Sequence, residues 1–158
     1  MGVFTYHNEI ASSVTRSRLF KAFVLDFDNL IPKIMKMGQN IEILEGNGGP
    51  GTVRKITYVE GGETKYVVEK WEAADEAKYV YSYSVIEGSG LAEGMEKITV
   101  EQKLEEGTDG GCVGKDSITF FTKLDAPPTD VVVSTIKALR EGLIRAIEAY
   151  LLAHPHEY

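Results

Sequence analysis

The chain has 158 residues, 43% of them hydrophobic, and carries a formal net charge of -7. This length suits one domain of ordinary size, so we expect residues 1–158 to fold as a single unit. Because the basic residues are scattered rather than gathered into a patch, the composition disfavours a protein that binds a nucleic-acid backbone.

The cysteine content and the apolar runs exclude further classes of protein. Cys112 is the single cysteine, which rules out an internal disulfide and a metal site built from several cysteines. The first residues, MGVFTY, lack the charged and apolar regions of a signal peptide. No apolar run approaches the roughly 20 residues of a membrane-spanning helix. We therefore expect a cytoplasmic protein that has no membrane partner, no bound metal and no cofactor.

An opening strand and two short helices are predicted for the first part of the chain. Residues Val3 to Ile10 have the character of a strand, and either Thr15 or Ser17 is placed to cap a short helix behind it. Asp28 is placed to cap a second short helix, Asn29 to Met35. The two helices follow each other directly.

From Ile41 onward the spacing of apolar residues changes to two, and glycine-rich turn signals recur between the apolar runs. This pattern predicts a meander of about six strands. The clearest strand is Glu96 to Leu104, and the run Tyr79 to Ile86 alternates in the same way. One face of the sheet is therefore expected to be covered and to carry several aromatic side chains.

A long amphipathic helix is predicted after Pro127 and Pro128. Thr129 is placed to cap it, and apolar residues recur at helical spacing for about 24 residues, until His154 and Pro155 end the helix. The expected apolar stripe is Val132, Ile136, Leu139, Leu143, Ile147 and Tyr150. A sheet with one dry face and one long helix form an α+β domain in which the sheet folds round the helix.

Six stretches of the sequence resemble one known family, and together they extend along the whole chain. They are MGVFTY, LFKAFVLDFDNLIPKI, EGNGGPGTVRKIT, YSYSVIEG, EKIT and AIEAYLLAHP. The chain resembles the plant pathogenesis-related class ten proteins, the family of the major birch pollen allergen and its food-allergen relatives. The resemblance implies one helix-grip, ligand-binding domain over residues 1–158. It has a curved seven-stranded antiparallel sheet around a long C-terminal helix, two short helices in a V, and a large hydrophobic cavity.

The resemblance also implies a function. It is that of a monomeric plant protein of stress and defence, which binds flavonoids, cytokinins, steroids or similar amphipathic molecules as a carrier, store or sensor. Three features depart from the family pattern. The segment Lys36 to Asn40 is one residue short, and Ile136 and Arg140 replace smaller residues on the inner side of the long helix. The ligand therefore cannot be taken from any relative.

The glycine-rich segment Glu45 to Gly51 is similar in spacing to a phosphate-binding loop. However, Thr52 and Val53 stand where such a loop has lysine and serine or threonine, and a strand follows instead of a helix. We interpret the segment as a rigid hairpin connection that needs positive φ and shapes the entrance of the cavity. Its candidate residues are Gly46, Gly48, Gly49 and Gly51.

Side chains on the covered face of the sheet and the inner face of the helix are the candidates for ligand binding. Tyr81 and Tyr83 offer flat rings with one hydroxyl each, with ordinary core packing as the alternative. Arg54 and Glu69 are expected inside the cavity, or alternatively at a solvated strand edge. Alternation places Asp116 on the covered face of the sheet, which would make it a buried carboxylate. A bulge that turns its side chain outward is the simpler interpretation. The whole predicted lining is Arg54, Ile56, Tyr58, Glu69, Tyr81, Tyr83, Val85, Ile98, Val100, Gln102, Ile136, Leu139 and Leu143.

An enzyme is the alternative to a carrier. The resemblance implies that Glu96, Glu148 and Tyr150 correspond to residues proposed for a weak ribonuclease, and two carboxylates serve as acid and base if they meet across a phosphate. The periodicity favours a simpler hypothesis, in which Glu96 and Glu148 face solvent. A condensing or isomerising enzyme that uses acids in the cavity is the other enzymatic alternative, and we assign no catalytic residue.

Overall fold

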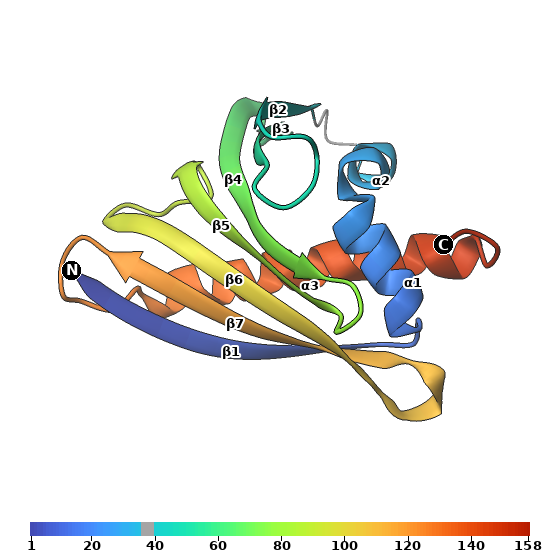
Figure 1. Ribbon diagram of the computed structural model, residues 1–158. Coiled ribbons are helices and arrows are strands. Elements are labelled where there is room, and N and C mark those ends of the chain that lie inside the picture. Colours follow the sequence, from blue (N-terminus) through green and yellow to red (C-terminus); the bar gives the residue numbers. More distant parts are fainter. Residues whose placement is uncertain (36–39) are drawn as a thin grey trace.

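The computed structural model describes residues 1–35 and 40–158, in which one sheet curves beside a long helix (Figure 1). The unusual segment 36–40 therefore lies outside the described residues except for Asn40. The strands are β1 (Gly2–Ser12), β2 (Asn40–Glu45), β3 (Val53–Glu60), β4 (Glu63–Asp75), β5 (Val80–Gly88), β6 (Met95–Glu106) and β7 (Cys112–Thr122). The helices are α1 (Arg16–Phe20), the π-helical η1 (Lys21–Leu25), α2 (Phe27–Ile34), the short 3-10 turn η2 (Thr108–Gly110) and α3 (Asp130–Ala153).

The sheet is antiparallel throughout, and its strand order is β1-β7-β6-β5-β4-β3-β2. The six strands β2 to β7 form the meander that the alternation predicts, and β1 adds the seventh strand at the far edge. β1 pairs with β7 along its whole length, from Gly2 opposite Thr122 to Ser12 opposite Cys112. The register shifts twice within β4, and such irregularities bend a strand and increase its twist. The expected α+β architecture is confirmed.

The helix α3 begins and ends where the sequence predicts. Thr129 caps it, because its hydroxyl accepts a hydrogen bond from the N–H of Val132 at 3.3 Å, and the helix ends directly before His154. The predicted apolar stripe of α3 was wrong at Leu139, which is 57% exposed. A helix turns by about 100° per residue, so the neighbouring Arg140 faces the sheet in its place. The buried residues of α3 are Val133, Arg140, Ile144, Ile147 and Leu151.

The short helices pack against α3 and one end of the sheet. Thr15 caps α1 as predicted, since its hydroxyl accepts a hydrogen bond from the backbone N–H three residues further on. The prediction of Asp28 as the cap of the second helix was wrong. α2 begins earlier, at Phe27, and Asp26 stands at its N-cap position. The carboxylate of Asp28 is instead an ion-pair partner of Arg54.

The interior consists of two apolar clusters with a polar layer between them. The cluster below the short helices includes Leu19, Phe20, Leu30, Ile31, Leu104, Ile144, Ile147 and Leu151. The other includes Val85, Ile98, Val100, Ile118, Phe120 and Val133. Gln102 of β6, Asp116 of β7 and Arg140 of α3 are buried between the residues of one cluster and those of the other. The polar layer therefore crosses sheet and helix at one level.

None of the described helices combines the length and the hydrophobicity that crossing a bilayer requires.

Candidate functional site

A buried ion pair joins the middle of α3 to the middle of β7. Arg140 Nε donates to Asp116 Oδ2 at 2.7 Å, and only 2% and 0% of the two side chains are exposed. Gln102 Nε2 donates to Asp116 Oδ1 at 2.6 Å, because β6 and β7 place these residues opposite each other. The bulge that we favoured for Asp116 was therefore wrong. The guanidinium compensates the buried carboxylate, which removes the need to turn it towards solvent.

Tyr81 and Tyr83 of β5 complete this polar layer. Their rings are stacked, with centroids 6.1 Å apart and planes inclined by 13°. Arg140 Nη2 donates to the Tyr81 hydroxyl at 3.0 Å, and Nη1 donates to the Tyr83 hydroxyl at 2.9 Å. Burial raises the pKa of both phenols, although the guanidinium acts in the opposite direction. Burial also opposes the charge of Arg140, but the two phenols and Asp116 hold its pKa above the ordinary value.

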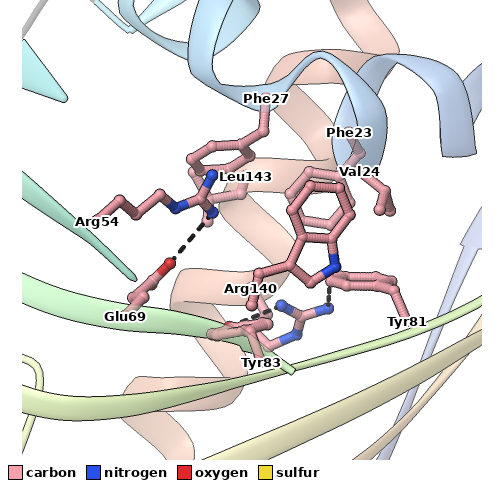
Figure 2. A pocket seen from close by; sticks show the side chains of 10 residues that line it. Phe23, Val24, Phe27, Arg54, Glu69, Tyr81, Tyr83, Arg140 and Leu143 are labelled. Carbon is pink, nitrogen blue, oxygen red and sulfur yellow. Dashed lines mark hydrogen bonds and ion pairs between the residues drawn. The ribbon is translucent and has the colours of Figure 1, made fainter. Parts of the chain in front are cut away.

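A cavity of about 40 Å³ lies between these tyrosines and the short helices (Figure 2). Its lining consists of Phe23, Val24, Phe27, Arg54, Glu69, Trp71, Tyr81, Tyr83, Arg140 and Leu143. Pockets for drug-sized ligands measure roughly 300–1,000 Å³. This part of the interior thus differs from the large hydrophobic cavity that the resemblance implies. The reason is physical: the Arg140 side chain and the two stacked rings occupy the space between sheet and helix.

A second pocket of about 190 Å³ lies beside the inner cavity, and we call it the mouth. Val24, Phe27, Arg54 and Trp71 line both spaces, so the mouth adjoins the inner cavity. Its other lining residues are Leu25, Asp26, Asp28, Asn29 and Gly48. The mouth is therefore formed by the junction of η1 and α2 on one side and by β3, β4 and the glycine loop on the other.

Arg54 is the central charged group where the mouth meets the inner cavity. It donates to Glu69 Oε2 at 3.2 Å and also pairs with Asp28, and its guanidinium carbon lies 4.5 Å from the centre of the Phe27 ring. Only 15% of the Arg54 side chain and 16% of the Glu69 side chain are exposed. The prediction that these two residues lie inside, rather than at a solvated strand edge, is confirmed.

The glycine loop is closed on itself between β2 and β3. Gly46 has φ +93°, and a Cβ there would lie 2.8 Å from the Cα of Thr52, so no larger residue fits without a shift. The N–H of Gly48 donates to the Thr52 hydroxyl at 2.9 Å, and the N–H of Gly51 donates to the carbonyl of Trp71 at 2.6 Å. The loop is thereby attached to β4, and Gly48 forms part of the mouth.

The predicted lining residues divide into three groups. Those that line the inner cavity are Arg54, Glu69, Tyr81, Tyr83 and Leu143. Those buried elsewhere or packed on an apolar cluster are Ile56, Val85, Ile98, Val100, Gln102 and Ile136. Two residues do neither: Leu139 is exposed, and the Tyr58 hydroxyl bonds to Ser89 at 2.7 Å in an exposed position. The prediction of Leu139 as lining was wrong, and the half-buried Tyr58 lines neither of the two spaces described.

Five lining residues are absent from the predicted lining: Phe23, Val24, Phe27, Trp71 and Arg140, although Arg140 was expected on the inner side of the long helix. A signal for Trp71 existed, since it is two residues from Glu69 on an alternating strand. Phe23, Val24 and Phe27 lie on η1 and α2, whose mutual angle no local pattern determines. Their place at the cavity follows from how the short helices dock on the sheet and α3.

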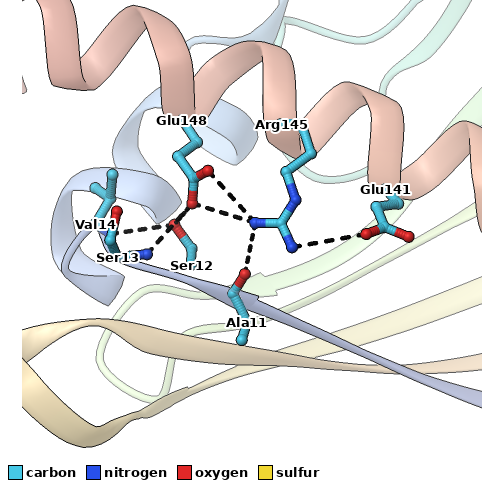
Figure 3. Close-up of polar contacts among 7 residues, drawn as sticks. All are labelled: Ala11, Ser12, Ser13, Val14, Glu141, Arg145 and Glu148. Carbon is cyan, nitrogen blue, oxygen red and sulfur yellow. Dashed lines mark hydrogen bonds and ion pairs between the residues drawn. The ribbon is translucent and has the colours of Figure 1, made fainter.

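The three residues considered for a ribonuclease do not form one site. Glu148 accepts hydrogen bonds from the Ser12 hydroxyl at 2.6 Å and from the Ser13 N–H at 3.3 Å (Figure 3). Ser12 lies in the row that continues to Glu106, at the end of β6, whereas Glu96 lies at the beginning of that strand. At about 3.3 Å per residue this separates the two carboxylates by roughly 30 Å. They cannot act together on one phosphate.

Tyr150 is part of a separate cluster near the end of α3. Its hydroxyl donates to the Glu157 carboxylate at 2.9 Å and accepts a hydrogen bond from Lys33 at 3.1 Å. These contacts join the C-terminal residues to α2. The exposed Glu96 thus lies far from Glu148, which takes part in a contact between α3 and β1. Tyr150 takes part in a different contact, between α3 and the C-terminal residues.

The charged side chains that line the inner cavity form ion pairs, Arg140 with Asp116 and Arg54 with Asp28 and Glu69. Among residues 1–35 and 40–158, no group of three or more His, Cys, Asp or Glu side chains is arranged to hold a metal ion.

Comparison with known proteins agrees with this architecture. The model of the pathogenesis-related protein Bet v 1 family matches residues 1–154, and the chain belongs to this family. It is 51% identical over 156 residues to the ABA-responsive protein ABR18 of Pisum sativum, covering 99% of both chains. It is also 51% identical to the stress-induced protein SAM22 of Glycine max, covering 98% of both chains.

A solved structure supports the same assignment. The crystal structure of Ara h 8.0201 is 49% identical in sequence and superposes with a TM-score of 0.87, over 96% of this chain and 99% of that one. The family predicted from the six sequence stretches is therefore confirmed. The protein accordingly belongs to the pathogenesis-related and stress-response class.

Proposed function

We propose that this protein reversibly binds small amphipathic molecules that contain a ring, as a carrier, store or sensor in stress or defence. One observation carries the proposal: the mouth, lined by Val24, Phe27 and Trp71 beside charged and polar side chains, adjoins an inner cavity that holds three polar groups, Tyr81, Tyr83 and Arg140. Apolar walls with a few placed polar groups are typical of small-molecule sites. Burial of the ring provides affinity, and the polar groups orient the ligand.

The size of the two spaces restricts the ligand. An apolar cavity of about 150 Å³ is large enough for benzene. The mouth, at about 190 Å³, therefore accommodates one ring, and the inner cavity of about 40 Å³ accommodates a small polar group. Flavonoids and steroids have several rings, so their binding requires α2 to move away from β3 and β4. Small ring compounds bind without this movement.

Trp71 provides a direct test, because it is the single tryptophan and lines both spaces. We expect saturable changes in its fluorescence on titration with a one-ring alcohol such as 4-phenylbutan-2-ol. A cytokinin, a flavonoid and a steroid serve as larger probes, and we expect them to bind more slowly. Unchanged fluorescence across this panel, together with no heat of binding in calorimetry, would refute the proposal.

A matched pair of variants places the ligand in the mouth. Val24 lines both spaces, and Val24→Phe fills them. Val131 is 73% exposed on the first turn of α3, and Val131→Phe makes the same change away from the site. We expect the first variant to weaken binding at least tenfold and the second to leave it unchanged. Circular dichroism of both variants checks that the fold is retained.

A reducing, cytoplasmic location and a monomeric state are part of this proposal. Cys112 is 1% exposed, and burial raises the pKa of its thiol, so the thiol is kept from oxidation and exchange. Localisation of a fluorescent fusion and light scattering of the purified protein test the two statements separately.

A further inference from the structure

The two tyrosine hydroxyls at the inner end of the cavity each retain an unused donor. A phenol that accepts a hydrogen bond through its oxygen still has its own hydrogen to donate. Within residues 1–35 and 40–158, the hydrogen bonds made by Tyr81 and Tyr83 hydroxyls are those that they accept from Arg140. Glu69 is the one carboxylate on the lining in this part of the chain, and its Oε2 is held by Arg54. Among the described residues, the hydroxyls of the buried Tyr81 and the half-buried Tyr83 therefore have no acceptor for their hydrogens.

The geometry brings these two donors together. Both hydroxyls contact terminal nitrogens of one guanidinium, at 2.9 and 3.0 Å, and the rings that carry them are stacked. Tyr81, Tyr83 and Arg140 all line the cavity of about 40 Å³, which holds a single small group (Figure 2). Hydrogen bonds in a chain polarise one another, so phenols that accept from a guanidinium are better donors than free phenols.

The charges around the hydroxyls determine which group is favoured. Asp116 already neutralises Arg140, so a carboxylate from the ligand would add an uncompensated charge to a buried site. An ammonium group would meet a guanidinium and two donors, and the Glu69 carboxylate on the lining is already paired with Arg54. A neutral carbonyl oxygen has two lone pairs and no hydrogen, which matches two converging O–H donors.

We propose that Tyr81, Tyr83 and Arg140 form a subsite for the carbonyl oxygen of a neutral ligand whose ring lies in the mouth. The subsite rests on the proposed function, and it names the ligand class: neutral ring compounds with a ketone, ester or amide on a short chain. Tyr81 and Tyr83 contact the oxygen. Arg140 is a positioning residue that holds both hydroxyls at the cavity.

Three compounds with one carbon skeleton test this subsite: 4-phenylbutan-2-one, 4-phenylbutan-2-ol and protonated 4-phenylbutan-2-amine. The alcohol can accept the same bonds but leaves its own hydrogen without a partner. We expect the ketone to bind about tenfold more tightly than the alcohol, since a buried donor left without a partner accounts for a factor of that order. The amine is expected to bind most weakly. Trp71 fluorescence and calorimetry measure all three.

Conservative variants connect the preference to the residues. Tyr81→Phe and Tyr83→Phe keep the rings and remove one donor each, and we expect both to reduce the preference for the ketone over the alcohol. Tyr6→Phe is the matched control, because Tyr6 packs against Phe120 in the other apolar cluster. Its preference is expected to equal that of the unmodified protein. The carbonyl stretching frequency of the bound ketone, shifted to lower wavenumber only when both phenols are present, is a readout that ring packing does not affect.

The outcomes separate the subsite from the function. Equal affinities for the three compounds, or an amine that binds most tightly, would overturn the subsite and leave the proposed function standing. A ketone preference that persists in both phenylalanine variants would also overturn it. Binding of none of the three would overturn the subsite, and the proposed function would be refuted with it only if the cytokinin, the flavonoid and the steroid also fail to bind.

Discussion

The guanidinium of Arg140 donates to the carboxylate of Asp116 at 2.7 Å while both side chains are almost fully shielded from solvent. The desolvation of two buried charges costs several kcal/mol, which their mutual attraction offsets only while both are present. This pair lies between two apolar clusters and also holds the two tyrosines of the site. Stability and ligand binding therefore depend on the same contact.

A double-mutant cycle measures this dependence. Arg140→Met alone is expected to lower the free energy of unfolding by about 3–5 kcal/mol, because it leaves Asp116 buried without its charged partner. Arg140→Met combined with Asp116→Leu is expected to recover most of that loss. Urea unfolding measures each variant. The surface pair Lys115 and Glu105, at 2.9 Å, is the control, and its removal is expected to change little because solvent screens it. A double variant as unstable as the single one would contradict this account.

The buried phenols predict a loss of stability at alkaline pH. Burial raises the pKa of Tyr81 and Tyr83 in the folded state above the ordinary 10.0. Above that pH the unfolded chain releases phenolic protons that the folded chain retains, so the free energy of unfolding falls as pH rises. The contribution of the two phenols to the free energy of unfolding is complete below pH 10. It is lost as the pH rises towards their raised pKa values in the folded state. Urea unfolding at several pH values measures the slope.

Absorbance at 295 nm gives an independent check on the phenols. Four of the eight tyrosines have a raised pKa and are expected to ionise late: Tyr81, Tyr83 and Tyr158, chiefly through burial, and Tyr66, through its hydrogen bond to Glu87. Tyr83→Phe is expected to reduce the late phase. Titration of every phenol in a single step near pH 10 would show that the polar layer is hydrated.

The glycine loop allows a comparison of two similar backbones. Gly46 and Gly48 have φ values of +93° and +97°, but a Cβ at Gly46 would clash with Thr52 whereas a Cβ at Gly48 would meet nothing within 4 Å. Gly48→Ala is expected to cost about 1–2 kcal/mol from backbone strain alone. Gly46→Ala is expected to cost more, and thermal unfolding measures both. Equal losses would mean that the contact with Thr52 relaxes freely.

Substitution of Glu148 separates a structural role from a catalytic one. Glu148→Ala leaves the Ser12 hydroxyl and the Ser13 N–H without their acceptor, so we expect a loss of about 1–3 kcal/mol in the free energy of unfolding (Figure 3). The exposed Glu96→Ala is the control and is expected to leave stability unchanged. RNA cleavage is expected to be the same in both variants and the unmodified protein. A loss of cleavage in both, with stability intact, would restore the ribonuclease hypothesis.

Much of the fold could be predicted because local patterns determine it. Alternation placed β5 and β6 correctly, and the caps at Thr15 and Thr129 are formed by adjacent residues. The face of α3 was less accurate. An arginine counts as polar in a hydrophobic pattern, so the periodicity favoured Leu139 over Arg140, although Arg140 is the residue that is buried.

The site was harder to predict because it depends on partners distant in sequence. Asp116 is acceptable in the interior only because Arg140 reaches it from α3, and no local pattern around either residue shows this. The volume of the cavity is likewise determined by the conformations of side chains from six elements. Resemblance to the family supplied Tyr81 and Tyr83, but it suggested a larger cavity than these particular side chains leave.

The pairing of β1 with β7 has a consequence for the order in which the chain folds. Gly2 lies opposite Thr122, so β1, the first strand to be synthesised, has no partner until β7, the last strand, has been synthesised. Contacts this distant in sequence slow folding, and until they form, the edge of β7 and the whole of β1 are open to other chains. A nascent chain that stops before residue 112 has a meander without its last strand. The sheet, and with it the proposed binding site, therefore assembles only when the polypeptide is nearly complete.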